Sequence, residues 1–461
     1  MKGVPWHLPG LPESEARGSE AGRTAAGASF RAPALSREDA GAVADEVRAA
    51  ALEARASLPA ARVIEAVAAA AGRLADPSDP AGEEAASVLS EDLGWPAALA
   101  EETLAGMGRS WTEDALGRVV QRELGGTAVL EGWTGGGGAL PGRRRRASGP
   151  PLLFVVHAGN VPGVAVTAAI RGLLVRSGVL SRAAGSEPGL LAGFARALTA
   201  EEPALGRSLA TTWWPADAGE AAWEVWVKRS GKVVVYGGEE AVRGVRARVP
   251  GHTDLVAYGP RVGVAVALPD AAPGHAAAAL AGDVCAYEQQ GCVSPRLAYA
   301  VGRDPLELGR RLSEALEEEV GRLPRPEPDD ATAVAIRSAR AEAEFAGLAG
   351  RSVHVLGGED LSWTVVVGGE DPLLTLGLPR LVRVHGAGSV EELGRTLAPL
   401  EGRIQTVGYA GRRGLPALAD LAARLGACRI APLGEVAWPP ADWLHDGRPQ
   451  LLPLLRWTEW E

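Results

Sequence analysis

Cysteine is scarce in this chain of 461 residues, which contains only Cys285, Cys292 and Cys428. Three cysteines are too few for a framework of disulfide bonds, and free thiols are typical of a reducing compartment. The N-terminal residues also contain no continuous apolar stretch of the length of a signal peptide. We therefore expect a cytoplasmic protein.

An excess of positive charge is also absent. The formal net charge is -10 and the isoelectric point is near 5.4, so the surface as a whole repels nucleic acid and anionic lipid. We therefore expect no nucleic-acid partner. The one basic cluster, the arginines at 143–146, lies between a glycine run and a Ser-Gly-Pro sequence. This setting is typical of a solvated loop, with contact to a phosphate as the alternative.

Long hydrophobic runs are missing as well. The most apolar segment, residues 152–170, is interrupted by His157, Asn160 and Pro162. Such interruptions disfavour lipid but suit a buried strand followed by a turn and a helix. We expect no membrane span.

The apolar residues that are present follow the periodicities of an α/β protein. From residue 36 to about 122 they recur at three- and four-residue spacing, which predicts an N-terminal layer of helices. After residue 151, short apolar runs alternate with amphipathic segments, and this order predicts a parallel sheet covered on both faces. Such sheets bind nucleotides at the carboxyl ends of their strands. The predicted strands are 152–158, 179–184, 231–238, 255–259 and 262–268, and the predicted helices between them include 164–177 and 239–249.

The length of the chain predicts more than one domain, because one hydrophobic core rarely serves so many residues. Residues 1–35 are rich in Gly, Pro, Ser and Glu without periodicity and are predicted to form a flexible tail. We assign residues 36–268 to the helices and a dinucleotide-binding α/β domain, 269–425 to a catalytic α/β domain, and 426–461 to a C-terminal docking segment. Its Trp-rich end is predicted to pack on the body of the protein or on a second subunit, and we expect a homo-oligomer.

Cys292 is the candidate nucleophile. It follows the predicted helix 271–290 in the sequence EQQGCVSP, where Gly, Gln, Ser and Pro surround it rather than an apolar stripe. Cys285 shares a helical face with Ala and Val and is predicted to be a small buried hydrophobe. A metal site is the alternative for the two thiols. Their separation by six residues, with no histidine nearby in sequence, disfavours it, so no metal is expected.

Two predicted junctions between a strand and a helix contain candidate binding residues. In HAGNVPG (157–163), Asn160 is either a helix N-cap or a donor to an oxyanion, and His157 is either a structural hydrogen-bonding residue or a proton donor. In YGGEEAVRG (236–244), Gly237 and Gly238 would allow a phosphate to approach the backbone. The full GxGxxG spacing is absent, so a plain turn remains the alternative.

These segments occur in order with EQQGCVSP, LEGRIQTVGYA, RIAPLG and HDGRP. In this combination, residues 36–461 resemble the acyl-CoA reductase family typified by LuxC, the fatty-acid reductase subunit of bacterial bioluminescence, within the aldehyde dehydrogenase superfamily. The resemblance implies an α/β, aldehyde dehydrogenase-like fold with two Rossmann-like domains and an N-terminal helical layer. It also implies NADPH as the cofactor, with NADH as the alternative.

The resemblance implies roles for individual residues. Cys292 would accept the acyl group and Asn160 would donate to the oxyanion. The residues that correspond to the cofactor site are Arg182, Gly237, Gly238, Glu239 and Gly259. Arg182 replaces the superfamily's lysine near the cofactor ribose, and an arginine can still pair with a 2′-phosphate. Val242 replaces a later turn glycine.

Ala257 stands where the aldehyde-oxidising members of the superfamily have a glutamate general base. Without that carboxylate, hydrolysis of a thioester to the acid should be slow. We therefore expect NAD(P)H-dependent reduction of a long-chain fatty-acyl thioester to the aldehyde through a Cys292 acyl-enzyme. The acyl donor would be acyl-CoA or a partner acyl-protein synthetase. The alternatives are an aldehyde dehydrogenase that produces the acid and a non-catalytic scaffold for an acyl-activating enzyme.

Overall fold

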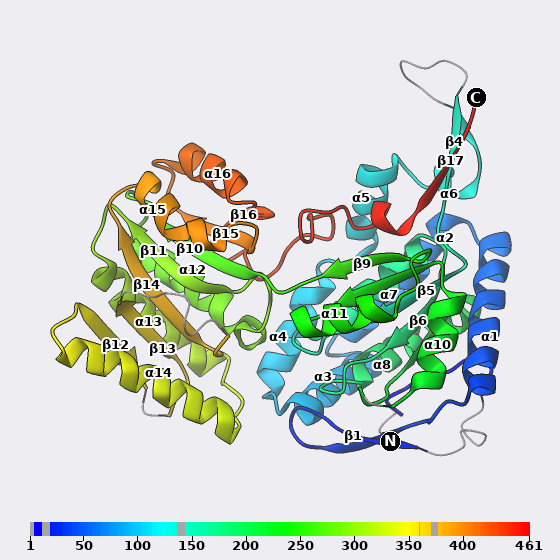
Figure 1. The fold of residues 1–461 in the computed structure, drawn as a ribbon, viewed down its shortest axis with the longest axis horizontal. Helices are drawn as coiled ribbons and strands as arrows, with labels where there is room; N and C mark the ends of the chain where they lie inside the picture. Colours follow the sequence, from blue (N-terminus) through cyan, green and yellow to red (C-terminus); the bar gives the residue numbers. More distant parts are fainter. Residues whose placement is uncertain (1–3, 12–18, 136–142, 217, 359, 370–376) are drawn as a thin grey trace. The chain divides into compact units, whose positions relative to one another are not determined.

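The computed structural model describes residues 4–11, 19–135, 143–216, 218–358, 360–369 and 377–461 (Figure 1). The chain forms two compact units. Unit 1 comprises Met1–Gly259, Pro440–Trp443 and Arg448–Glu461, and unit 2 comprises Pro260–Pro439 and Leu444–Gly447. Each unit contains a largely parallel sheet with helices, so the predicted α/β class is confirmed.

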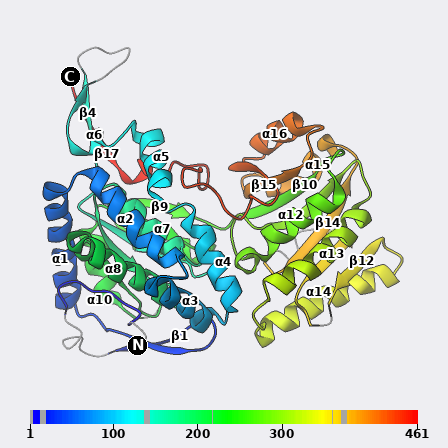
Figure 2. The same cartoon turned by 180° about the vertical axis from the view of Figure 1, so that it is seen from behind.

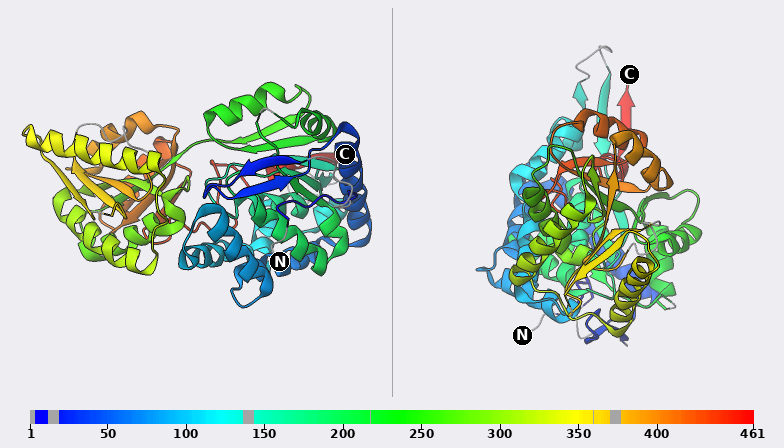
Figure 3. Two further views of the ribbon diagram at one scale, coloured as in Figure 1. Left: turned by 90° about the horizontal axis from the view of Figure 1, so that it is seen from below. Right: turned by 90° about the vertical axis from the view of Figure 1, so that its left-hand side faces the viewer.

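The first 35 residues are not a flexible tail in the part that the structure describes. The strands β1 (Glu20–Arg23) and β2 (Ser29–Ala32) form an antiparallel hairpin, drawn in dark blue in Figure 3. Upstream of it, His7 pairs with Thr211 on the edge strand of a sheet, and Leu8 and Leu11 are buried in the core of unit 1. The prediction was wrong because tertiary partners order this segment, and its own sequence has no periodic pattern.

The predicted layer of helices is present in unit 1. The first helix begins with a capping box, in which Ser36 and Asp39 exchange hydrogen bonds between side chain and backbone. The first helix packs beside α10 (Glu220–Arg229) and the second beside α8 (Gly189–Glu201), as Figure 2 shows. The helices of this layer are α1 (Arg37–Ser57), α2 (Ala60–Ala75), α3 (Pro80–Leu93), α4 (Ala97–Gly108), α5 (Glu113–Leu124) and α6 (Ala128–Glu131).

The main sheet of unit 1 has five parallel strands in the order β7-β6-β5-β8-β9. This order is that of a doubly wound nucleotide-binding sheet. Its central strands β5 and β8 are buried along their whole length, as their continuous apolar sequences predict. The strands are β5 (Leu152–Val156), β6 (Gly178–Arg182), β7 (Leu209–Thr212), β8 (Lys232–Tyr236) and β9 (Asp254–Tyr258). The helices that connect them are α7 (Val164–Leu174), α8 (Gly189–Glu201), α9 (Pro203–Arg207), α10 (Glu220–Arg229) and α11 (Glu239–Arg248).

The basic cluster is not a loop in the described residues. Strand β4 (Arg144–Ser148) lies between β17 (Arg456–Trp460) and β3 (Thr134–Gly135) in a small antiparallel sheet. The prediction failed because β17 is supplied by the far end of the chain. The guanidinium groups of Arg144 and Arg145 stack over the rings of Trp460 and Trp457.

Unit 2 contains a sheet of seven strands in the order β12-β13-β14-β11-β10-β15-β16, in which only the pairing of β12 is antiparallel. The strands are β10 (Val262–Ala267), β11 (Pro295–Val301), β12 (Val353–Gly357), β13 (Thr364–Gly368), β14 (Leu381–Ala387), β15 (Ile404–Ala410) and β16 (Arg429–Pro432). The helices are α12 (Pro273–Cys285), α13 (Pro305–Arg322), α14 (Asp330–Leu348), α15 (Val390–Leu397) and α16 (Leu415–Arg424), with short 3-10 helices η2 (Ala286–Gln289) and η3 (Ala398–Leu400). A further one, η4 (Leu452–Leu454), belongs to unit 1.

The predicted domain boundaries at 268 and 425 differ from the observed ones. Strand β10, assigned to the first domain, pairs with β11 and β15 of unit 2. Strand β16, assigned to the docking segment, pairs with β15 in the same sheet. An apolar run shows that a strand exists but not which sheet it joins.

Residues 152–170 form β5, a turn and the first part of α7, as their interruptions predict. Within the described ranges, no helix combines the length and the apolar character that crossing a membrane requires.

Candidate functional site

The predicted cofactor residues of unit 1 lie at one edge of its parallel sheet. Arg182 ends β6, residues 237–239 follow β8 and Gly259 follows β9, and the carboxyl ends of these parallel strands meet at that edge. Backbone hydrogen bonds link neighbouring turns: His157 N–H donates to the Arg182 carbonyl at 3.1 Å, and Gly237 N–H donates to the Tyr258 carbonyl at 3.1 Å. This edge is where open α/β sheets bind nucleotides.

Asn160 lies in the loop between β5 and α7 and is exposed. The helix begins at Val164, and its N-cap is Gly163 with a left-handed φ of 82°. A side chain at Gly163 would be strained by this φ and would also crowd Met107. Asn160 is therefore not the N-cap, and the role of oxyanion donor stays a prediction.

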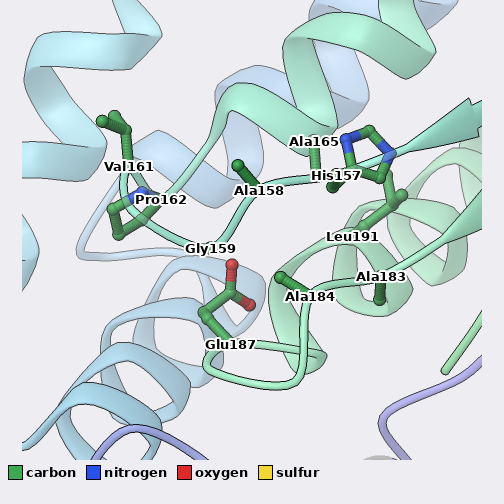
Figure 4. Close-up of a pocket in the computed structure, with 10 residues that line it drawn as sticks. All are labelled: His157, Ala158, Gly159, Val161, Pro162, Ala165, Ala183, Ala184, Glu187 and Leu191. Atoms are coloured by element: carbon green, nitrogen blue, oxygen red, sulfur yellow. The ribbon is translucent and has the colours of Figure 1, made fainter. Parts of the chain in front are cut away.

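A small pocket lies against this loop (Figure 4). The Glu187 side chain points toward the backbone of Gly159 and accepts a hydrogen bond from Leu190 N–H at 2.6 Å. Desolvation raises the pKa of Glu187 to about 8. The pocket is lined by His157, Ala158, Gly159, Val161, Pro162, Ala165, Ala183, Ala184, Glu187 and Leu191.

His157 is buried in the wall of this pocket, and its ring lies parallel to that of Tyr236. Neither ring nitrogen has a hydrogen-bond partner among the described residues, so the expected structural hydrogen bond is absent from this part of the chain. Burial lowers the pKa of His157 to about 3. The imidazole is therefore neutral at physiological pH, which argues against its alternative role as a proton donor.

Arg182 ends β6 at the same edge. Its Nη2 donates to the Trp214 carbonyl at 2.7 Å, and the guanidinium carbon lies 5.7 Å from the centre of the Trp214 ring. Desolvation, and then the charge of Arg248, lowers its pKa. A guanidinium has five N–H donors, so the contact with Trp214 leaves donors for a phosphate oxygen.

The turn between β8 and α11 leaves its backbone open to a ligand. Gly238 is the N-cap of α11, and a Cβ atom at this position would meet no atom within 4 Å. Glu239 and Glu240 lie in the first turn of the helix and are exposed. Their carboxylates would repel a pyrophosphate, but the carboxylate oxygens can accept hydrogen bonds from ribose hydroxyls. Together with Arg182, these residues fit the ribose end of a dinucleotide.

Ala257 lies in strand β9, at the position where the resemblance implies a glutamate base in aldehyde-oxidising relatives. This position therefore carries no carboxylate. The Ala257 carbonyl instead accepts a hydrogen bond from Arg448 Nη1 at 3.2 Å. Gly259 follows the strand, and a Cβ atom there would also meet no atom within 4 Å.

Cys292 belongs to unit 2 and follows a strained turn. The α-helix ends at Cys285, earlier than predicted, because Tyr287, Glu288 and Gln289 adopt left-handed φ values of 35°, 56° and 57°. Three consecutive non-glycine residues in this region are unfavourable unless their surroundings hold them there.

Buried polar contacts hold this turn. The Gln289 side chain donates to the Pro295 carbonyl at 2.6 Å and accepts from Leu381 N–H at 3.0 Å. The Glu288 carboxylate pairs with Arg380 at 2.5 Å and with Arg325 at 3.4 Å. The backbone before the thiol is therefore fixed by β11 and by the start of β14.

The Cys292 side chain is partly exposed, but protein atoms surround most of it. Gln405 Nε2 lies 3.5 Å from Sγ, and His445 Nε2 lies 4.0 Å from Sγ. Desolvation raises the pKa of Cys292 to about 11, and the hydrogen bond from Gln405 offsets only part of this increase. Burial by itself therefore favours the protonated thiol at neutral pH. Cys285 is fully buried with a pKa raised to about 12, which agrees with its predicted structural role.

Asp446 connects the residues around the thiol. Its Oδ1 accepts from Gln405 Nε2 at 2.9 Å, and it lies 3.3 Å from Arg261 Nε and 3.7 Å from His445 Nε2. No role was predicted for any of these four residues. HDGRP and LEGRIQTVGYA were noted as segments, but nothing in their spacing links them to Cys292. Among the described residues, no group of three His, Cys, Asp or Glu side chains is arranged to hold a metal ion.

A model of the acyl-CoA reductase (LuxC) family matches residues 56–457. The chain belongs to this family. Membership makes it an oxidoreductase that acts on acyl groups and confirms the resemblance seen in the sequence.

Curated relatives agree with this assignment. The chain is 25% identical over 354 residues to the long-chain acyl-protein thioester reductase of Vibrio harveyi. The aligned region covers 76% of this chain and 72% of the relative. It is 26% identical over 359 residues to the protein of the same name from Aliivibrio fischeri, covering 76% of this chain and 71% of the relative.

Solved structures identify the fold as that of aldehyde dehydrogenases, as predicted. Aldehyde dehydrogenase 21 from Physcomitrella patens superposes with a TM-score of 0.78 at 13% identity, covering 99% of this chain and 97% of that one. An NAD-dependent benzaldehyde dehydrogenase from Corynebacterium glutamicum superposes with a TM-score of 0.73 at 15% identity, covering 99% of this chain and 98% of that one.

Proposed function

We propose that this protein reduces a long-chain fatty-acyl thioester to the aldehyde with NADPH, through an acyl-enzyme on Cys292. The supporting observation is a partly exposed thiol behind a strained, anchored turn in a chain of the acyl-CoA reductase family. Of the three cysteines, Cys285 is fully buried. Cys428 is partly exposed but follows no such turn.

In the first step, Cys292 Sγ attacks the thioester carbonyl and the donor thiol leaves, so the acyl group becomes bound to the protein. The Cys292 backbone N–H and the Asn160 amide are assigned to the oxyanion, whose stabilisation is worth about 10²- to 10³-fold in rate per donor. When bound, the reduced nicotinamide supplies the hydride that brings the acyl carbon to the aldehyde level. Ala257 offers no carboxylate to activate water, so release as the acid is disfavoured.

The residues assigned to the cofactor are Arg182, Gly237, Gly238, Glu239 and Gly259. Arg182 would pair with the 2′-phosphate of NADPH, and the preference for NADPH over NADH depends on it. Substitution Arg182→Ala should weaken NADPH binding by roughly tenfold or more, the cost of one charge-assisted contact, and leave NADH binding nearly unchanged. Quenching of tryptophan fluorescence can measure both dissociation constants, and an equal loss for the two cofactors would contradict this assignment.

The acyl donor is proposed to be acyl-CoA or the acyl group of a partner acyl-protein synthetase, since the curated relatives are named acyl-protein thioester reductases. The three free cysteines suit a cytoplasmic location for this reaction.

The direct test is incubation with a labelled long-chain acyl-CoA, quenching, and peptide mass spectrometry. The label is expected on Cys292, and addition of NADPH should release the aldehyde. A Cys292→Ala variant should form neither product. A label on Cys285 or Cys428 would contradict the proposal. Acid formed from an aldehyde with NADP⁺ would favour an aldehyde dehydrogenase, and a chain that binds no nucleotide and has no reactive thiol would be a scaffold.

A further inference from the structure

The Cys292 thiol needs a proton acceptor to become a nucleophile. Burial by itself raises the pKa of this thiol, and a protonated thiol is a poor nucleophile unless a neighbouring group accepts its proton. The superfamily's glutamate is replaced by Ala257, so the base must be another group.

The basic side chain of His445 lies against the sulfur. His445 Nε2 is 4.0 Å from Sγ, within reach of a hydrogen bond to sulfur, and the imidazole is only 12% exposed. Both residues belong to unit 2. A histidine beside a cysteine is the usual arrangement for activating a thiol, because the imidazole accepts its proton near neutral pH.

We propose that His445 is a catalytic residue that takes the proton of the Cys292 thiol and returns it to the leaving thiol of the acyl donor. The inference rests on the proposed function, since it names the base of that same acyl transfer.

The proton balance of the step closes without a further reactant. The S–H proton moves to His445 Nε2, and the bond between Sγ and the acyl carbon forms. The bond between the acyl carbon and the donor sulfur then breaks, and the donor thiolate receives the proton from His445. One thioester is exchanged for another, with no net change in protons or oxidation state.

The charged groups around the pair favour this transfer on balance. Asp446 Oδ1, at 3.7 Å from Nε2, stabilises the imidazolium, although its charge also raises the pKa of the thiol. Arg261 bonds Asp446 and lowers the pKa of the thiol through its positive charge. Gln405 donates to Sγ and would continue to do so when the sulfur is a thiolate.

Tyr287 also interacts electrostatically with Cys292. It is buried with a pKa raised well above its ordinary value, so it is neutral and does not compete for the proton. Cys428 interacts with Arg261 and Asp446, and burial raises its pKa as well. Neither residue can serve as the base.

The test is the rate of Cys292 alkylation by iodoacetamide between pH 5 and 10, measured by peptide mass spectrometry without substrate. In the native protein the rate should level off near neutral pH, because the thiolate forms together with the imidazolium. In His445→Gln it should be at least tenfold lower at pH 7 and rise about tenfold per pH unit up to pH 10, as for a lone thiol of high pKa. His354→Gln, the same change at an exposed histidine of unit 2, is the control and should behave as the native protein does.

Each outcome has a definite meaning. A native rate that rises tenfold per unit through pH 10 overturns the proposal, and this result needs no variant to fold. Equal profiles for the native protein and His445→Gln overturn it too.

A second measurement separates this inference from the proposed function. His445→Gln should slow acylation of Cys292 by acyl-CoA at pH 7 by about 10²- to 10⁴-fold, the range of general acid–base catalysis. Normal acylation in this variant would leave the reductase proposal intact and remove His445 from it. The alkylation rate of the native protein could level off near neutral pH while acyl-CoA does not acylate Cys292. That result would support the Cys292–His445 pair and contradict the proposed reductase function.

Discussion

Cys285 and Cys292 have the same side chain but different surroundings. Cys285 is fully buried at the end of α12, whereas Cys292 is partly exposed with the Gln405 amide and the His445 ring at its sulfur. Reactivity of a thiol depends on access and on groups that favour the thiolate. The difference between the two residues therefore lies in their neighbours, several of which are distant in the sequence.

Glu187 predicts a pH dependence of stability. Its pKa is raised from 4.5 to about 8 by desolvation, so between these pH values the folded protein holds a proton that the unfolded chain has released. Stability should therefore fall as the pH rises from 5 to 8. Thermal melts of Glu187→Gln should show a weaker dependence than the native protein.

The control for this prediction is Glu101→Gln, at an exposed position of α4, which should leave the pH dependence as it is. If Glu187→Gln and the native protein lost stability equally over this range, Glu187 would not be protonated in the folded state.

At the scale of elements, the turn before Cys292 is held by charge buried beneath it. Residues 287–289 keep left-handed conformations because Glu288 pairs with Arg380 and Arg325, all of which are almost fully buried. Buried ion pairs contribute little net stability when complete, but removal of one partner leaves an uncompensated charge. The turn should therefore be sensitive to any change at Glu288.

Substitution Glu288→Gln should destabilise unit 2 by about 3 to 5 kcal/mol, because it leaves two buried arginines without their carboxylate. It should also slow alkylation of Cys292, since the strained turn that positions the thiol would relax. Circular dichroism melts and the iodoacetamide rate measure the two effects. Glu314→Gln, which breaks an exposed pair with Arg311, is the matched change and should cost under about 1 kcal/mol. A similar cost for both variants would contradict this account of the turn.

At the scale of the whole molecule, segments far apart in the chain complete unit 1. Its N-terminal residues add Leu8 and Leu11 to the core, and its C-terminal residues add β17 beside β4. Trp457 and Trp460 on β17 are 38% and 54% exposed, although their rings also contact Arg145, Arg144 and Trp133 of unit 1. Packing of their exposed faces on a second subunit stays a prediction.

Replacement of both Leu8 and Leu11 by alanine should destabilise unit 1 by about 4 kcal/mol or more, because each change leaves a cavity in the core. Thermal melts can measure the loss. Leu52→Ala, at a leucine that is 44% exposed, should have a much smaller effect. If the double variant melted like the native protein, the N-terminal segment would not be part of the core.

A homo-oligomer is expected to use the indoles of β17. The double variant Trp457→Ser and Trp460→Ser should raise the dissociation constant roughly tenfold or more, since aromatic residues dominate interface energies. Light scattering after size exclusion gives the molar mass over a dilution series. Phe345→Ser, at another exposed aromatic residue, is the control. Dissociation by the control alone would place the interface on α14, and a native protein that is monomeric throughout would contradict the expectation.

Local patterns were enough to predict much of the fold. The continuous apolar runs of β5 and β8 and the spacing in α1 and α2 are properties of neighbouring residues, so they are readable in the sequence. The family, and with it Cys292 as a candidate, followed from short segments in a fixed order. The position of Asn160 relative to the helix start was less reliable, because Gly163 can begin the helix equally well.

The sequence by itself determined the class of fold, the family and the thiol to examine, because each depends on residues adjacent in the chain. The tertiary structure decided which sheet β10 and β16 join, where residues 4–11 and 19–35 pack, and which side chains surround Cys292. His445, Gln405 and Asp446 reach the sulfur only after the chain has folded, and no local spacing records contacts between residues so far apart.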